Sequence, residues 1–567
     1  MSNNRRKPID NKSQVAGATD VPLSTHTVSG LLRETAGRFP NSDAAVFCAD
    51  DQRWSYKEFD AKVDRLAAGL VRLGLQKGDR LGIWAPNCPE WLLAQFATAR
   101  VGVILVNINP AYRLRELSFA LEKVACRALI TAERFKSSDY IAMLQELLPE
   151  LNSPSKESVK SDRLPALEFI IKTGDERIPG MLNFNELMLI DSSVLDSSVE
   201  MIESTLHSSD PINIQFTSGT TGLPKGATLT HHNIVNNARH VVAEMKLTEQ
   251  DKLCIPVPFY HCFGMVMGTL GSVSCGATMV IPAAGFDPVS TLKSVNDERC
   301  TALYGVPTMF VAMLESNEFP SFDVSSLRTG IMAGAPCPVE VMKRVQANMH
   351  MNEVTIAYGM TETSPVSFQS AVDDPLDKRV SSVGRVHPHV EVKIIDRDGS
   401  VVPVGEQGEL CTRGYSVMQG YWEEEAQTRD CIDAENWMHT GDLATIAEDG
   451  YCKITGRLKD VIIRGGENIY PKELEDFLYT IPGVAQVQVF GLPDKHYGEV
   501  VTAWFVLQEN AQLAAEDVFD YCKGQIAHQK VPTIIEFVDA LPMTVTGKPQ
   551  KFVMRDIMIE KLGLQAL

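Results

Sequence analysis

Two spacings of hydrophobic residues alternate along the chain, and they predict strands and helices in turn. Short apolar runs at residues 80–85, 102–107 and 277–281 are typical of buried strands. Residues 56–73 instead carry apolar side chains every three or four positions, which predicts an amphipathic helix. Strands that alternate with helices are typical of α/β domains with helix-covered parallel or mixed sheets. We therefore predict the α/β class for the larger part of the chain.

The pattern changes near Gly456. Short strands predicted at 461–463, 487–490 and 501–506 alternate with helices that begin near Pro471 and Ala515. Proline suits a first helical turn, because that turn leaves its backbone N–H groups unpaired in any case. We predict a polar tail without order at 1–27, a large N-terminal domain at 28–457, and a small mobile α+β C-terminal domain at 458–567.

Composition excludes several classes of protein. A formal net charge of −19 disfavours a nucleic-acid binder, which needs a basic face. The 12 cysteines form no Cys-x-x-Cys pair, so the spacing indicates neither zinc nor a disulfide framework. Reduced thiols favour a cytoplasmic location, with the mitochondrial matrix as the alternative. Residues 253–286 lack charged side chains, but their prolines and glycines predict a buried helix and strand instead of a transmembrane span.

Residues 216–226, Phe-Thr-Ser-Gly-Thr-Thr-Gly-Leu-Pro-Lys-Gly, are the most informative stretch of the chain. They follow a strand predicted at 212–216, and Thr230 then caps a helix predicted to begin at His231. Glycines let several backbone N–H groups and hydroxyls turn toward one anion, and the lysine adds positive charge. The loop therefore predicts a phosphate cradle. Pro224 stands where a Walker loop needs its second glycine, which disfavours a mononucleotide kinase or GTPase.

Four later segments carry further candidate chemistry. Residues 358–365 (Tyr-Gly-Met-Thr-Glu-Thr-Ser-Pro) offer an aromatic face, a hydroxyl and a carboxylate at a turn. The aspartate in 439–442 (His-Thr-Gly-Asp) fits a ribose diol, although a turn is the commoner place for that residue type. Residues 456–468 join charges to flexible glycines, and 546–548 (Thr-Gly-Lys) place a lysine in a polar loop.

In this order, the five segments resemble the adenylate-forming superfamily of acyl-CoA synthetases, luciferases and peptide-synthetase adenylation domains, from about residue 30 to about 560. Segments 211–222 and 463–471 look most like the medium- and long-chain fatty acyl-CoA ligases. The resemblance implies that ATP converts a carboxylate to an acyl-adenylate with release of pyrophosphate, and that the thiol of coenzyme A then displaces AMP. ATP, Mg²⁺ and coenzyme A are the implied cofactor and co-substrates.

The same resemblance implies roles for individual residues. Thr361 contacts the α-phosphate, Glu362 binds Mg²⁺, and Lys548 bridges the carboxylate and the α-phosphate during adenylation. Asp442 and Arg457 hold the ribose. The β- and γ-phosphates are held by Thr217, Ser218, Gly219, Thr220, Thr221, Gly222 and Lys225, and the adenine end by Gly334, Ala335, Pro336, Tyr358, Gly359 and Met360.

Resemblance also implies the thioester step and the acyl pocket. The small domain rotates about Lys459 and presents Gly465, Gly466 and Glu467, which leave a slot for the pantetheine arm of coenzyme A. The acyl pocket is placed at His261, Val306 and Met309, with Gly334 and Gly359 as further wall positions. For His261, packing against the carboxylate end of the acid is favoured over a catalytic base. Room at the glycines and the apolar walls favour an aliphatic acid longer than acetate.

We therefore predict an ATP-dependent acyl-CoA ligase for a medium-chain fatty acid, with a homodimer among its expected assemblies. An aryl acid, or a short branched or sulfur-containing acid, stays open as the substrate. A luciferase-like monooxygenase is the alternative from another class. A peptide-synthetase module is disfavoured, because the chain ends about twenty residues after Lys548 and leaves no room for a fused carrier. A non-catalytic AMP sensor is disfavoured by the intact set of charged motif residues.

Overall fold

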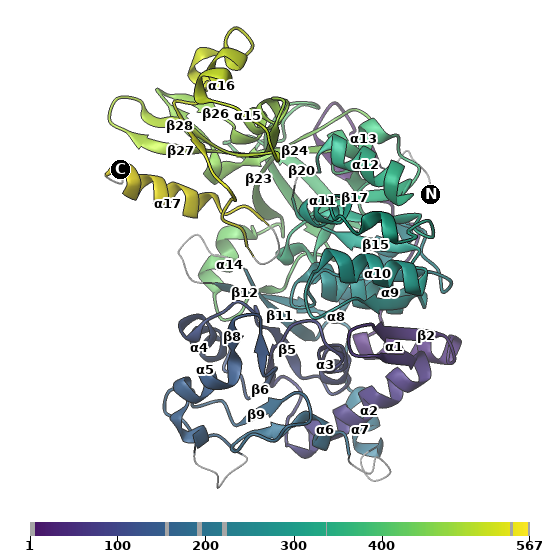
Figure 1. Ribbon diagram of the computed structural model, residues 1–567. Coiled ribbons are helices and arrows are strands. Elements are labelled where there is room, and N and C mark those ends of the chain that lie inside the picture. Colours follow the sequence, from purple (N-terminus) through teal and green to yellow (C-terminus); the bar gives the residue numbers. More distant parts are fainter. Residues whose placement is uncertain are drawn as a thin grey trace. The chain divides into compact units, whose positions relative to one another are not determined.

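The computed structural model describes residues 6–152, 158–189, 196–217, 224–335, 337–544 and 548–564, which form two compact units (Figure 1). The first unit comprises Ala16–Glu391 and Arg413–Met438. The second comprises Arg6–Val15, Val392–Thr412 and the described residues from His439 onward. Helices accompany mixed sheets in both units, which confirms the predicted α/β class with a large and a small part.

The first unit contains an eight-stranded sheet. Its strands run parallel as far as β11, and then β12 and β22 pair antiparallel at one edge. The order is β10 (Leu182–Asn183), β9 (Phe169–Lys172), β6 (Ala128–Thr131), β4 (Arg80–Trp84), β5 (Ile104–Asn107), β11 (Pro211–Thr217), β12 (Lys225–Thr230) and β22 (Gly420–Tyr421). Its helices include α2 (Tyr56–Arg72), α3 (Pro89–Arg100), α4 (Leu114–Lys123), α5 (Tyr140–Leu147), α6 (Phe184–Leu187) and α7 (Asp196–Glu203).

A nine-stranded sheet also belongs to the first unit, and its six strands from β17 to β2 run parallel. The order is β19 (Arg385–Val386), β18 (Val366–Gln369), β17 (Glu353–Gly359), β16 (Thr329–Ala333), β15 (Ala302–Gly305), β13 (Lys252–Cys254), β14 (Thr278–Ile281), β2 (Asp43–Phe47) and β3 (Gln52–Ser55). Its helices include α1 (Val28–Arg38), α8 (His231–Glu244), α10 (Pro288–Glu298), α11 (Pro307–Leu314), α12 (Val339–Met349) and α13 (Leu376–Ser381).

The uncharged stretch 253–286 folds as the sequence predicts. It forms the π-helix η4 (Phe263–Leu270), then α9 (Gly271–Cys275), and then the fully buried strand β14. Within the described part of the chain, no helix has the length and apolar character needed to cross a membrane.

Two sheets lie wholly or mostly in the second unit. The sheet that lies mostly there has the strand order β1 (Gln14–Ala16), β20 (Val390–Ile395), β21 (Gly408–Gly414), β23 (Met438–Ile446) and β24 (Cys452–Arg457). The second has β26 (Glu467–Ile469), β25 (Ile462–Arg464), β28 (Gly498–Leu507) and β27 (Val484–Asp494), with β29 (Ile534–Phe537) also paired to β28. The short helix η7 (Leu458–Asp460) follows β24, and α15 (Pro471–Leu478), α16 (Ala515–Cys522) and α17 (Lys551–Leu562) complete this part.

The N-terminal segment departs from expectation. Its polar composition predicts disorder for 1–27, but from Arg6 onward the structure describes an ordered chain that includes β1, so the prediction is wrong for 6–27. In the second unit, Ser13 N–H donates to the Val402 carbonyl at 2.8 Å. In the first, Ser24 N–H donates to Asn236 Oδ1 at 2.6 Å. These partners are hundreds of residues away, so local composition does not reveal them.

His231 ties α1 to α8 and stays neutral. Its Nδ1 accepts a hydrogen bond from Val28 N–H at 3.0 Å, and its side chain is fully buried. Burial lowers the pKa of His231 from 6.5 to about 3, against an opposing effect of Asp210 and with a small contribution from Lys77. Between these two values the unfolded chain binds a proton that the folded chain does not. Stability therefore falls as pH drops from 6.5 toward 3.

We predict that His231→Asn, which keeps an acceptor near Val28, flattens the pH dependence of stability. Between pH 7.5 and 5.5 the wild type should lose about 1.4 kcal/mol more than the variant, as expected for one proton over one pH unit below the unfolded pKa. Urea unfolding followed by tryptophan fluorescence measures the difference. His350→Asn is the matched control, because His350 is exposed and its left-handed backbone suits asparagine. Parallel pH profiles for wild type and His231→Asn would contradict the assignment.

Candidate functional site

The two ends of the glycine-rich loop lie side by side. β11 and β12 form an antiparallel pair in which Thr217 is directly opposite Lys225. β11 also runs parallel to β5, so Thr217 lies at the carboxyl edge of the parallel strands, where α/β sheets present ligand sites. The Thr230 cap of α8 forms as predicted, with its hydroxyl accepting from Asn233 N–H. The predicted residues Ser218, Gly219, Thr220, Thr221 and Gly222 lie outside the described residues.

Glu362 contacts the end of β11, although Thr217 at that end is 145 residues away in the sequence. It lies in the short helix η6 (Thr361–Thr363), which follows β17. Its side chain is only 5% exposed, and its Oε1 accepts a hydrogen bond from Thr217 Oγ1 at 3.2 Å. The neighbouring Thr361 Oγ1 lies 3.9 Å from Cys262 Sγ. The structure thus brings together two predicted motifs, which are the glycine-rich loop with Thr217 opposite Lys225 and the turn that carries Glu362.

The other predicted residues of the first unit gather along one edge of the nine-stranded sheet. His261 follows β13, Val306 follows β15, Gly334 and Ala335 follow β16, and Tyr358 ends β17 together with Gly359. Because these four strands are parallel neighbours in the order β13, β15, β16 and β17, their carboxyl ends share that edge. Met309 lies in the first turn of α11, directly after Val306, and Met360 comes between β17 and η6. Pro336 lies outside the described residues.

Two glycines at this edge are required by the backbone. Gly334 has φ +88°, a conformation that residues with a Cβ rarely adopt. At Gly359, a Cβ would lie 1.7 Å from the carbonyl oxygen of Pro365. No larger side chain fits there unless the turn itself moves.

His261 uses one ring nitrogen locally. Its Nδ1 accepts a hydrogen bond from Phe263 N–H at 3.1 Å, which fixes the ring at the start of η4. This contact agrees with the packing role favoured for His261, since a backbone donor already engages that nitrogen.

Asp442 and Arg457 form a pair in the second unit. They face each other across β23 and β24, and Arg457 Nε donates to Asp442 Oδ1 at 3.0 Å. The Asp442 side chain is 10% exposed, whereas that of Arg457 is 56% exposed. A buried carboxylate beside an exposed cation is a suitable acceptor for the hydroxyls of a sugar.

Glu409, Cys411 and His439 form a separate group of metal-ligand types in the second unit, with ligand atoms within 4.8 Å of one another. His439 Nδ1 lies 3.0 Å from Glu409 Oε2 and 3.7 Å from Cys411 Sγ. The other carboxylate oxygen, Oε1, accepts from Gly441 N–H at 3.2 Å. Glu409 is thus occupied in holding the segment of β23 that carries Asp442.

The remaining predicted residues of the second unit lie in turns and short segments, and all of them are exposed except the half-buried Lys548. Lys459 lies in η7, between β24 and β25, and is exposed. Gly465 and Gly466 form the two-residue turn between β25 and β26 with φ values of +59° and +87°, as a type I′ hairpin requires, and Glu467 begins β26. A Cβ on Gly466 would meet no atom within 4 Å. Lys548 N–H donates to Thr544 Oγ1 at 2.9 Å, which fixes the backbone at that lysine.

Tyr421 is a site residue that the sequence motifs do not indicate. Its hydroxyl donates to Glu362 Oε1 at 2.9 Å, and the ammonium of Lys225 lies 4.9 Å from the centre of its ring. Burial and the Glu362 carboxylate raise the pKa of Tyr421 well above its usual value, so the phenol stays a donor. Because β22 contains only two residues, its pairing with β12 cannot be read from hydrophobic periodicity.

The donor set around Glu362 fits a magnesium ion bound together with a nucleotide. Mg²⁺ prefers oxygen ligands and is commonly held by one or two carboxylates and by substrate phosphates. Glu362 supplies a buried carboxylate whose Oε1 is engaged by two hydroxyls, so its orientation is fixed. Lys225 supplies a positive charge beside it for the phosphates.

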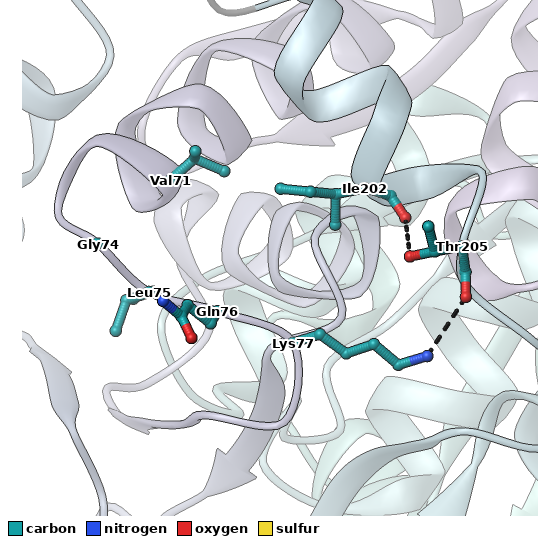
Figure 2. A pocket seen from close by; sticks show the side chains of 7 residues that line it. All are labelled: Val71, Gly74, Leu75, Gln76, Lys77, Ile202 and Thr205. Carbon is teal, nitrogen blue, oxygen red and sulfur yellow. Dashed lines mark hydrogen bonds between the residues drawn. The ribbon is translucent and has the colours of Figure 1, made fainter.

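A cavity of about 320 Å³ elsewhere in the first unit contains none of the predicted site residues (Figure 2). It lies between the end of α2 and α7, with Val71 and Ile202 among its apolar walls. Lys77 at its rim donates to the Thr205 carbonyl at 3.3 Å and pairs with Asp210 at 2.6 Å. The lysine charge is therefore already compensated, and the cavity offers no group for the predicted chemistry.

Sequence families match almost the whole chain. The family described as AMP-binding enzyme matches residues 32–422, and the family described as AMP-binding enzyme C-terminal domain matches residues 473–548. The protein named medium-chain acyl-CoA ligase ACSF2, mitochondrial, from Danio rerio is 46% identical over 560 residues, which cover 98% of this chain and 92% of that protein.

Solved structures of related proteins are similar to this chain over nearly its full length. ATP-bound MatB from Rhodopseudomonas palustris is similar with a TM-score of 0.81 at 28% identity, over 95% of this chain and all of that one. The fatty acyl CoA synthetase of Mycobacterium tuberculosis is similar with a TM-score of 0.69 at 27% identity, over 94% of this chain and 99% of that one.

Proposed function

The chain belongs to the AMP-binding enzyme family, and from this premise we propose that it activates a medium-chain fatty acid. The protein is an ATP-dependent acyl-CoA ligase that uses Mg²⁺, releases pyrophosphate while forming acyl-AMP, and then forms acyl-CoA and AMP. The observation that carries its site assignment is that Thr217 and Tyr421 both donate to the buried carboxylate of Glu362, while the Lys225 ammonium lies over the Tyr421 ring.

Charge complementarity supports the proposed roles in adenylation. In that step, negative charge builds on the α-phosphate and on the departing pyrophosphate. The residues of the loop 217–225 hold the β- and γ-phosphates, with Lys225 as their cation, and Thr361 donates its hydroxyl to the α-phosphate. Glu362 holds Mg²⁺, which neutralises phosphate charge when bound. Lys548 contributes a further positive charge between the carboxylate of the acid and the α-phosphate.

Edge geometry and strand pairing support the proposed nucleoside contacts. The adenine end is assigned to Gly334, Ala335 and Pro336 with Tyr358, Gly359 and Met360. Asp442 accepts the ribose hydroxyls, and Arg457, its partner in the ion pair, stays beside it.

A mobile C-terminal domain remains our proposal for how two reactions share one site. Residues 458–567 rotate about Lys459, and present first Lys548 and then the hairpin of Gly465, Gly466 and Glu467. The open space beside Gly466 supports this assignment, because a narrow pantetheine arm needs a turn without side chains. Such rotation would be a conformational step that gates each half-reaction.

An aliphatic chain of medium length is supported by the pocket residues and by the Danio rerio relative, whose name gives it as a medium-chain acyl-CoA ligase. Val306 and Met309 are buried apolar side chains at the edge that carries His261, and Gly334 and Gly359 contribute no side chain at the same edge. We also propose a cytoplasmic location for this chain and a homodimer as its assembly. The mitochondrial matrix is the alternative location, because the name of that relative includes the word mitochondrial.

We predict carboxylate-dependent release of pyrophosphate from ATP and Mg²⁺, stimulated by coenzyme A and highest for fatty acids of about C6 to C12. The panel should run from acetate to palmitate and include benzoate, with and without coenzyme A. A maximum with benzoate would support an aryl-acid ligase. Release that ignores coenzyme A and consumes oxygen would support a luciferase-like reaction instead.

Lys548→Ala is expected to reduce adenylation by roughly 10²–10³-fold, because a charge positioned at the developing phosphate charge is lost. Thioester formation from a supplied acyl-adenylate should stay close to wild type. Lys561→Ala is the matched control, since Lys561 is an exposed lysine of the neighbouring helix α17. Equal losses in both half-reactions would contradict the role of Lys548.

A further inference from the structure

Segment 418–422 connects two parts of the phosphate site through backbone hydrogen bonds. Met418 N–H donates to the Glu362 carbonyl at 2.8 Å, and Trp422 N–H donates to the Gly226 carbonyl at 2.8 Å. Tyr421 lies between these two bonds and pairs with Ala227 of β12, two residues after Lys225. The segment therefore fixes η6 relative to β12 before any ligand binds.

The side chain of Tyr421 connects the same two parts, because it contacts both Glu362 and Lys225. Its hydroxyl donates to the carboxylate of Glu362, whose backbone carbonyl already holds Met418, and its ring face lies against the ammonium of Lys225. One residue thus contacts both the cation proposed for the phosphates and the carboxylate proposed for the metal. Tyr421 is about one-third exposed or less, and its hydroxyl is positioned as the donor toward Glu362.

When hydrogen bonds fix one oxygen of a buried carboxylate, the position of its second oxygen is fixed as well. Thr217 and Tyr421 both donate to Oε1 of Glu362, which leaves Oε2 directed to a different partner. Hydrogen-bond donors of this kind orient carboxylates that bind metal ions, and their loss typically costs about 10–100-fold in metal affinity or activity. A cation over the face of a tyrosine ring is attracted to that face, which restricts the position of the lysine.

We propose that Tyr421 is a positioning residue, which directs Glu362 Oε2 to the magnesium ion through its hydroxyl and holds Lys225 at the phosphates through its ring. This inference rests on the metal role proposed for Glu362. The hydroxyl and the ring then act on different steps of nucleotide binding, and two substitutions separate them. Tyr421→Phe removes the hydrogen bond and keeps the ring, whereas Tyr421→Leu removes both.

Manganese binding tests the hydroxyl without relying on catalysis. The intact protein is titrated with Mn²⁺ in the presence of α,β-methylene-ATP, and bound Mn²⁺ is measured by electron paramagnetic resonance. For Tyr421→Phe we expect the Mn²⁺ dissociation constant to rise about 10-fold or more, with the number of sites unchanged. Binding of the metal-free nucleotide, measured by calorimetry, should stay within about twofold of wild type.

Tyr415→Phe is the matched control, because Tyr415 is a buried tyrosine near the same segment whose hydroxyl accepts from Asn237 at 3.4 Å. It should leave Mn²⁺ affinity unchanged. Tyr421→Leu should weaken binding of the metal-free nucleotide as well, because Lys225 loses its contact with the ring. Unchanged metal-free binding in this variant would overturn the role of the ring.

A double-mutant comparison separates positioning from general destabilisation. If Tyr421 acts through Glu362, then adding Tyr421→Phe to Glu362→Gln should cause little further loss of Mn²⁺ affinity. Equal losses in both backgrounds, or an unchanged Mn²⁺ affinity of Tyr421→Phe alone, would overturn the inference. If Glu362→Gln itself leaves Mn²⁺ affinity unchanged, the metal role proposed for Glu362 fails, and the role of Tyr421 fails with it. Partial unfolding would lower the number of sites and is thereby distinguished from weaker affinity.

Discussion

A buried carboxylate is the constraint on which the proposed nucleotide site of the first unit depends. A carboxyl group on a side chain that is only 5% exposed must be satisfied by hydrogen bonds or compensating charge. Glu362 obtains its donors from the end of β11 and from β22, which lie far from it in sequence. Satisfying this one group therefore brings together the end of the glycine-rich loop, the turn after β17 and the short strand at the sheet edge. The hydrogen bonds that Glu362 requires are therefore the same contacts that assemble the site.

In the second unit, strand register provides the partner of a buried carboxylate. Pairing of β23 with β24 puts Asp442 opposite Arg457, so the carboxylate has a cation as its partner. The side chain of Asp442 is buried, whereas that of Arg457 is mostly exposed. In both units, strand pairing thus places a partner beside a buried carboxylate.

Sequence patterns predict the regular parts of this protein well, because burial imposes periodicity on them. β11, the capped helix α8 and the helix at Pro471 follow directly from local residues. The N-terminal segment and Tyr421 do not, since their order depends on partners that are distant in the chain. Motif resemblance supplies Glu362, Asp442 and Arg457 as candidates, but not the contacts that hold them. Those contacts depend on register, and a two-residue strand such as β22 carries too few residues to encode one locally.

Gly359 has a consequence for how substrate preference changes during evolution. A Cβ at this position would overlap the Pro365 carbonyl, and Gly334 has a backbone that disfavours any side chain. For the acyl pocket proposed above, neither glycine is a practical place for mutation to reduce the available space. Selection for shorter acids must therefore work through Val306, Met309 and their neighbours, whose side chains can change size without disturbing the turn. The turn around Gly359 and the backbone at Gly334 therefore leave any change of pocket size to the side chains around these two positions.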